Sequence, residues 1–176
     1  MSRRKQPLIY GTFNLYLNGG LDVVGVAECT LPQFEGRSET LSGAGIMGEI
    51  EVTPKGQYSA MTFTANFRAL YDPSILSLPI GGDSQTFDLR PALEVQDIAD
   101  GTREIVPERW TINGPIKTIN PGGRGTASAA DASIEQAVYN LTHYVDGKEV
   151  RKIGVLTGID VVNGVDQYAA TRAAIS

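Results

Sequence analysis

A two-residue alternation of apolar and polar side chains is the feature that most constrains how this chain can fold. From Met61 to Ala69 every second residue is apolar, and polar or charged residues stand between them. Successive side chains of a β-strand point to opposite faces of a sheet, so this pattern predicts a long strand over 59–70 with one dry face. The same period recurs at 87–95, 106–112 and 153–161. The chain is therefore predicted to be mainly β.

Turn signals between these segments indicate how the strands are connected. The two clearest are Asp146-Gly147, between 134–145 and 148–157, and Asp100-Gly101, between 85–98 and 103–113. An Asp-Gly pair favours a tight hairpin because both residues tolerate positive φ. Tight turns join antiparallel strands, so the predicted fold is an antiparallel β-sandwich or barrel and not a βαβ fold.

Two strands carry more specific expectations. Pro91 interrupts the alternation at 87–95 and lacks a backbone donor, so that strand is expected to lie at a sheet edge or to be bulged there. Residues 21–31 are denser in small apolar side chains and are expected to form a more buried strand.

Two short helices are predicted beside the strands. The first covers about Asp72 to Leu78, because Asp72 can cap a helix that begins at Pro73. The second covers about Val165 to Ile175, where alanine is dense and Asn163 is the candidate N-cap.

Two segments do not fit a compact sandwich. Residues 33–58 contain five glycines and little apolar pattern before Ile50, and residues 120–132 are small and glycine-rich. Long connections of this kind are usually functional or disordered. We predict a long protruding hairpin or loop at about 33–58 and a flexible loop at about 120–132, within a single domain that spans 1–176.

Residue types that usually carry chemistry are scarce. The chain has one His, one Cys and a net charge of −5, and its carboxylates are scattered. Tight phosphate binding needs clustered Lys and Arg. The one basic cluster is Arg3-Arg4-Lys5, where a solvated terminus is favoured over a binding arm. We predict no catalytic, cofactor-binding or metal-binding residues, and we do not expect an enzyme.

The segment Gly43 to Gly48 matches the dinucleotide-binding pattern G-x-G-x-x-G letter for letter. That site requires a strand before the glycines and a helix that begins among them. A strand pattern follows instead, and its carboxylates, Glu49 and Glu51, would repel phosphates. The favoured interpretation is a hairpin tip, where glycine permits a tight turn.

Three single residues have structural interpretations. His143 lies in a strand pattern without partners for a catalytic relay, and Cys29 is expected to be a small buried thiol. Trp110 has apolar strand neighbours, so core packing is favoured over a role as an interface anchor. No apolar run approaches 18 residues, so neither a signal peptide nor a membrane contact is expected.

These observations favour a self-assembling scaffold, because a hairpin too long to pack on the core of its own subunit must contact another molecule.

Three segments carry a family resemblance: Val24 to Pro32, Ser42 to Gly48, and Tyr144 to Val150 followed by Ile159 to Gln167. In these segments the chain resembles the major tail tube family of contractile-tailed bacteriophages. The match at the closing hairpin and C-terminal segment is the most specific.

The resemblance implies a structural subunit of the inner tail tube, with hexameric rings that stack into a hollow tube with a negatively charged lumen for DNA. The implied partners are the sheath, the baseplate or tube initiator, the tape measure and the tail terminator, in a virion tail assembled in the host cytoplasm. The implied subunit-interface residues are Leu41, Gly43, Gly45, Ile46, Met47, Gly48, Glu49, Glu51, Asn163, Gly164 and Asp166.

Two alternatives stay open. The chain can be the inner tube of a contractile bacteriocin or of a secretion or injection system. A third hypothesis is a monomeric β-barrel, a ligand-binding protein or an enzyme, that binds a small molecule and uses the hairpin at 33–58 as a lid.

Overall fold

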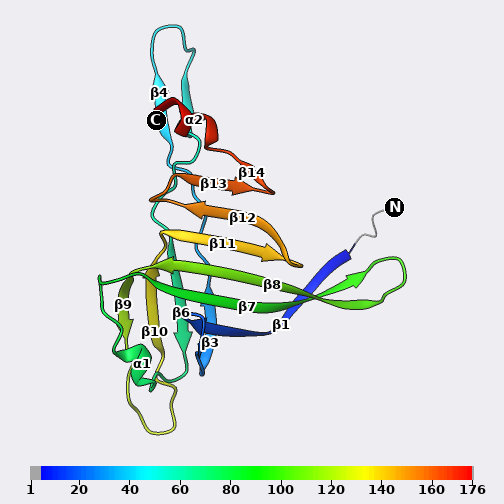
Figure 1. Ribbon diagram of the computed structural model, residues 1–176, viewed down its shortest axis with the longest axis vertical. Coiled ribbons are helices and arrows are strands. Elements are labelled where there is room, and N and C mark those ends of the chain that lie inside the picture. Colours follow the sequence, from blue (N-terminus) through cyan, green and yellow to red (C-terminus); the bar gives the residue numbers. More distant parts are fainter. Residues whose placement is uncertain (1–4, 176) are drawn as a thin grey trace.

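Residues 5–175 are described by a computed structural model and form three antiparallel sheets and two short helices (Figure 1). The large sheet has the order β14 (Val165–Asp166), β13 (Ile159–Val162), β12 (Lys148–Gly154), β11 (Asn140–Val145), β8 (Arg103–Gly114), β7 (Gln85–Asp97), β1 (Lys5–Leu17) and β2 (Leu21–Asp22). The small sheet has the order β3 (Val26–Thr30), β6 (Thr62–Phe67), β10 (Ala132–Ala137) and β9 (Ile116–Asn120). The third sheet pairs β4 (Glu39–Ser42) with β5 (Glu49–Val52).

The core lies between the large and the small sheet. In β6 the alternation places Phe63, Ala65 and Phe67 in this core, and the polar residues between them point away. From the large sheet Leu15, Leu89, Trp110 and Leu141 are buried against them. The predicted mainly-β antiparallel fold is therefore confirmed as a sandwich, and no closed barrel forms within residues 5–175.

Both predicted hairpins are present, but only the first has the expected two-residue turn, because the connection between β7 and β8 covers 98–102. Asp146 and Gly147 have φ of 49° and 73° and join β11 to β12, and Gly101, with φ of 74°, lies in the turn between β7 and β8. The strand expected over 59–70 is shorter and covers Thr62–Phe67. The segment 134–145 is divided, because β10 belongs to the small sheet and β11 to the large one.

Of the two alternatives predicted for Pro91, an edge strand or a bulge, the edge strand is wrong, whereas the pairing with β1 shifts register next to Pro91. β7 lies between β1 and β8, and Pro91 faces Phe13 of β1. On the other side, pairing with β8 is interrupted between Leu89 and Ala92, where Pro107 of β8 faces Ala92. The two prolines share this interruption, so each occupies a place where no ladder donor is needed.

Two other strand expectations need correction. The alternation at 153–161 belongs to two antiparallel strands, β12 and β13, because the chain reverses through Gly158 at φ 61°. Residues 21–31 do not form one buried strand. They divide into β2 and β3, and β3 is an edge of the small sheet with mostly exposed residues.

The helix α1 (Pro73–Leu76) forms as predicted, because the Asp72 side chain accepts a hydrogen bond of 2.8 Å from the backbone of Ser74. The helix α2 (Ala169–Ile175) begins later than expected, since the residues before it form β14. Asn163, with φ of 49°, lies in the turn between β13 and β14 and is not a helix cap. Neither helix within residues 5–175 is long and apolar enough to cross a membrane.

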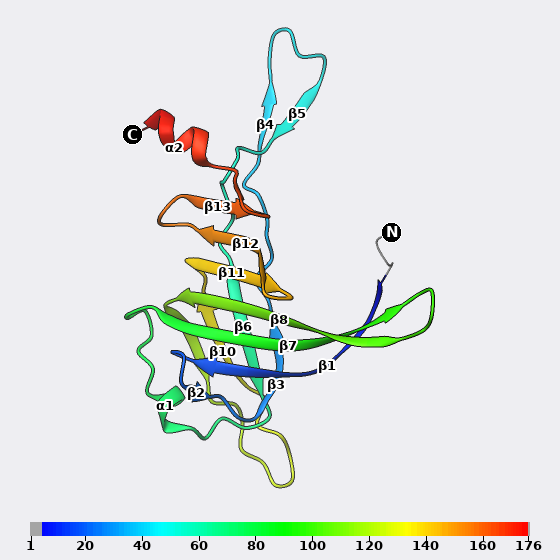
Figure 2. The ribbon, with the colours of Figure 1, turned by 45° about the vertical axis from the view of Figure 1, so that its right-hand side comes forward.

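The two long connections lie at opposite ends of the molecule (Figures 1 and 2). The β4–β5 hairpin extends away from the sandwich at one end, and the segment 121–131 forms a loop at the other. In that loop Arg124 donates hydrogen bonds to the carbonyl oxygens of Pro121, Gly122 and Gly123. The flexibility of the loop and the single-domain organisation stay predictions.

Candidate assembly surfaces

The β4–β5 hairpin has one apolar and one polar face, and neither face is covered. Leu41 pairs with Ile50, and Val52 lies on the same face opposite Glu39. The other face carries Thr40, Ser42, Glu49 and Glu51. All eight strand residues are exposed. The exposed fraction is 45% for Leu41 and 48% for Ile50. Exposed apolar surface on a protruding element indicates a contact with another molecule.

The hairpin tip contains the other residues predicted for this interface. Gly45 and Gly48 have φ of 92° and 127°, which L side chains rarely adopt, so the turn requires glycine there. Ile46 and Met47 are both exposed, and Met47 is fully so. The glycine segment joins two strands and starts no helix, so it lacks the helix N-terminus that a dinucleotide site needs.

A polar cluster fixes the base of the hairpin to the large sheet. The Tyr58 hydroxyl donates a 2.7 Å hydrogen bond to the carboxylate of Asp160 in β13 and accepts a 2.8 Å bond from Arg151 in β12. The Arg151 guanidinium also lies 4.7 Å from the ring centre of Phe34. Phe34 is on the ascending leg of the hairpin and Tyr58 on the descending leg. Both legs are therefore held by one arginine.

The C-terminal segment packs against the same base. Gly56, with φ of 70°, lies beneath the ring of Tyr168, where an added Cβ would come within 2.4 Å of the ring. Arg172 of α2 donates to the carbonyl of Gly158 and, at 2.6 Å, to the carboxylate of Asp166. The hydrogen bond from Arg172 lowers the pKa of Asp166.

The predicted interface residues thus form two groups. Leu41 to Glu51 lie on the protruding hairpin, and Asn163 and Gly164 lie in the exposed turn between β13 and β14. Asp166 is bound within the chain by Arg172. The role of these residues in assembly stays a prediction.

A charged cluster on the open face of the large sheet was not predicted from the sequence. Register places Tyr16, Asp88, Thr111, Thr142 and Lys152 in one row across this face, which points away from the small sheet. These five residues are polar, and Asp88 lies between Tyr16 and Thr111. Alternation alone assigns Asp88 to the polar side of β7, but its partner in β8 is not visible in the sequence.

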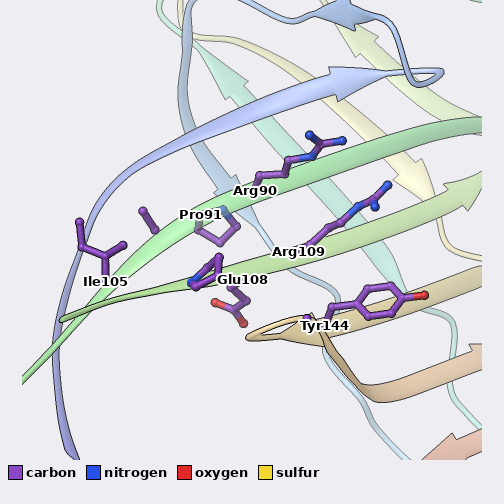
Figure 3. Close-up of a pocket in the computed structure, with 9 residues that line it drawn as sticks. Arg90, Pro91, Ile105, Glu108, Arg109 and Tyr144 are labelled. Atoms are coloured by element: carbon purple, nitrogen blue, oxygen red, sulfur yellow. The ribbon is translucent and has the colours of Figure 1, made fainter.

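Two arginines hold the Asp88 carboxylate. Arg90 donates to it from two nitrogens, at 2.7 and 3.1 Å, and Arg109 donates at 2.7 Å. Burial of Asp88 alone would raise its pKa, but the bonds from Arg109 and Arg90 outweigh burial and hold the pKa below its ordinary range. Figure 3 shows both arginine side chains extending in the same direction from neighbouring strands. Together with Tyr144 they line a concavity of about 740 Å³.

The single histidine belongs to a packed cluster on the other face of the sheet. Its ring stacks on Trp110 at 3.6 Å, and its Nε2 lies 2.6 Å from Glu108. Glu108 also accepts hydrogen bonds from Trp110 and Tyr10. Trp110 is buried, so the prediction of core packing is confirmed.

Cys29 is half-buried beside this core, and burial raises the pKa of its thiol to about 12, so the reactive thiolate is strongly disfavoured. Among residues 5–175, no group of three or more His, Cys, Asp or Glu side chains is placed to hold a metal ion.

Comparison with known proteins gives the class: the phage tail tube protein FII family matches residues 9–175, and the chain belongs to that family. The tail tube protein of Escherichia phage P2 is 29% identical over 162 residues, which cover 90% of this chain and 91% of that protein. The resemblance found in the sequence is confirmed.

Membership of this family makes the chain a structural protein of the bacteriophage virion. It is a component of the tail, where it assembles with other tail proteins.

Proposed function

We propose that the chain forms hexameric rings that stack into the inner tube of a contractile tail, and that the β4–β5 hairpin joins each subunit to another copy. The observation that carries this proposal is the exposed apolar face of Leu41, Ile50 and Val52. Full burial of one such side chain contributes about 1.5–3 kcal/mol. An isolated two-stranded hairpin is marginally stable in water, so a partner surface would also order it.

Ring closure would use the free edge of the large sheet. Within residues 5–175, β2 pairs with β1 only at Tyr16 and Leu17, which leaves most of the outer edge of β1 open. Open edges pair with other strands. If the sheets of neighbouring subunits join in this way, a heterologous contact closes into a ring, and the open face lines the lumen.

The proposed lumen is negatively charged overall and lets DNA pass without specific binding. The chain carries 20 Asp and Glu against 15 Lys and Arg, which supports a surface that repels phosphates. The proposed partners are the sheath, the baseplate or tube initiator, the tape measure and the tail terminator. Assembly would take place in the host bacterial cytoplasm, with no membrane contact and no catalytic step.

The main test is negative-stain microscopy of the purified chain, compared with a variant that lacks residues 38–52. We expect rings or hollow tubes from the full chain. We expect the variant to stay monomeric while circular dichroism reports a folded β-domain, with a signal lowered only by the loss of β4 and β5. A persistent monomer at high concentration would refute the proposed assembly, and normal tubes from the variant would refute the role of the hairpin.

Two rival hypotheses are an inner tube of a bacteriocin or injection system and a monomeric ligand-binding protein. An inner tube of a bacteriocin or injection system has the same architecture, and similarity to a phage tail tube protein favours the virion. A ligand-binding protein with a lid predicts saturable binding by a monomer. Residues 33–58 line neither of the two pockets in the sandwich that involve Pro91 and Glu108, so the hairpin is not placed as their lid.

A further inference from the structure

We propose that Asp88 is a built-in counter-ion that prevents Arg90 and Arg109 from binding nucleic acid on the open face of the large sheet. The inference rests on the proposed function, in which this face lines the channel for DNA. It assigns to Asp88, which is not part of the hairpin, the role of weakening the binding of DNA to the channel wall.

Asp88 occupies part of the donor set with which the two arginines would otherwise bind phosphate: two nitrogens of Arg90 and one of Arg109. A guanidinium uses the same paired N–H edge for a carboxylate and for a phosphate. The Nε and Nη2 edge of Arg90 is turned to Asp88, and so is the Nε of Arg109. Arg90 also lies 4.6 Å above the ring of Tyr16, which fixes the direction of its head.

The carboxylate of this cluster is buried, and the two arginines that it pairs with are exposed. The Asp88 side chain is only 4% exposed, whereas those of Arg90 and Arg109 are 48% and 50% exposed. The carboxylate is therefore committed to the two arginines and to Thr111, which donates at 3.3 Å. The cations lie within reach of solvent and of any polyanion that passes over the face.

The charge balance explains why masking matters in a channel. Without Asp88 the two guanidiniums would present two positive charges side by side. Each additional phosphate contact strengthens DNA binding by about tenfold near 0.1 M salt and steepens its salt dependence by about 0.9 in log–log slope. The contact would be repeated in every subunit, so even a weak grip on each would retard the passage of DNA.

Asp88→Asn tests the inference, and Asp83→Asn is its matched control, because Asp83 is exposed and the change in net charge is the same. Binding of a fluorescent 20-base-pair duplex to the full, unassembled chain is measured by anisotropy from 50 to 200 mM salt. We expect Asp88→Asn to bind about tenfold more tightly than Asp83→Asn, with a steeper salt slope. Equal binding by the two variants would overturn the proposal.

A second variant keeps the test decisive if Asp88→Asn does not fold. Arg109→Gln in the otherwise wild-type chain should weaken DNA binding no more than Arg103→Gln, which removes an exposed arginine of the same strand. A much larger loss for Arg109→Gln would show that Arg109 already contacts DNA and that Asp88 masks nothing. Ring formation is scored separately by microscopy, so failure of the masking and failure of the proposed tube are distinct results.

Discussion

The strand β6 and the β4–β5 hairpin obey the same two-residue alternation but have opposite surroundings. In β6 the apolar side chains of Phe63, Ala65 and Phe67 are almost fully buried between the sheets. In the hairpin Leu41 and Ile50 face each other across two strands and remain exposed. Alternation therefore specifies that a strand has an apolar face, and the rest of the assembly decides what covers it.

The largest effect should come from truncating the buried side of this comparison. Phe63→Ala leaves a cavity next to Phe87, whose ring centre is 5.7 Å away, and should lower the free energy of unfolding by about 3–5 kcal/mol. Ile50→Ala in the hairpin should change it by less than about 0.5 kcal/mol. Urea unfolding of the unassembled chain measures both. A similar loss for Ile50→Ala would mean that the hairpin packs on its own sandwich.

The same comparison shows what the sequence could predict. Alternation and Asp-Gly turns depend on neighbouring residues, so the mainly-β class, two hairpins and the exposed glycine turn were all predictable. Which sheet a strand joins depends on residues far apart in the chain. The segment 153–161 has one apolar period but reverses at Gly158, and Pro91 lies inside a sheet because Pro107 shares its break.

The candidate surfaces divide in the same way. The protruding hairpin was predictable, since its length and glycine content are local properties, and its role as an interface stays a prediction. The Asp88 cluster was not, because Arg109 reaches Asp88 across 21 residues of sequence. The clamp between Tyr58 and Asp160 spans 102 residues and gives no local signal either.

The second prediction tests the hydrogen bonds of Tyr58 to Asp160 and Arg151, which connect the hairpin to the sandwich. Tyr58→Phe removes the hydroxyl between Asp160 and Arg151 and leaves a buried carboxylate poorly paired, which should cost about 1–3 kcal/mol. Relative to the wild-type chain, the variant should exchange its backbone amides faster at 33–58, with a smaller change in β6. Tyr168→Phe is the matched control, because no hydrogen bond to its hydroxyl is found within residues 5–175. Unchanged exchange at 33–58 would show that the clamp does not fix the hairpin.

The third prediction concerns pH on the open face of the sandwich. The pKa of Asp88 in the folded chain lies below its ordinary value of 3.8, so its ion pairs stabilise the fold above that value and are lost as the pH falls through the lower folded-state pKa. Near pH 7 the wild-type chain should be more stable than Asp88→Asn by about 1–2 kcal/mol.

Unfolding titrations from pH 7 to pH 3 measure this difference, which should shrink below about pH 4 as the carboxylate is protonated. Asp83→Asn again serves as the control, and its stability should follow that of the wild-type chain. A difference for Asp88→Asn that grows as the pH falls would contradict the assigned ion pairs.

The smallest effect on folding is expected on the polar face of the hairpin. Glu49 is exposed, so Glu49→Lys should change the unfolding free energy by less than about 0.5 kcal/mol. If the hairpin contacts another copy, the same change should raise or lower the concentration at which tubes form, and light scattering can follow this. Ile50→Asp, on the apolar face, should impair assembly more than Glu49→Lys, because it places a charge where apolar surface is proposed to be buried. The reverse order would mean that the hairpin binds its partner through its carboxylates, and the exposed apolar face would then need a different explanation.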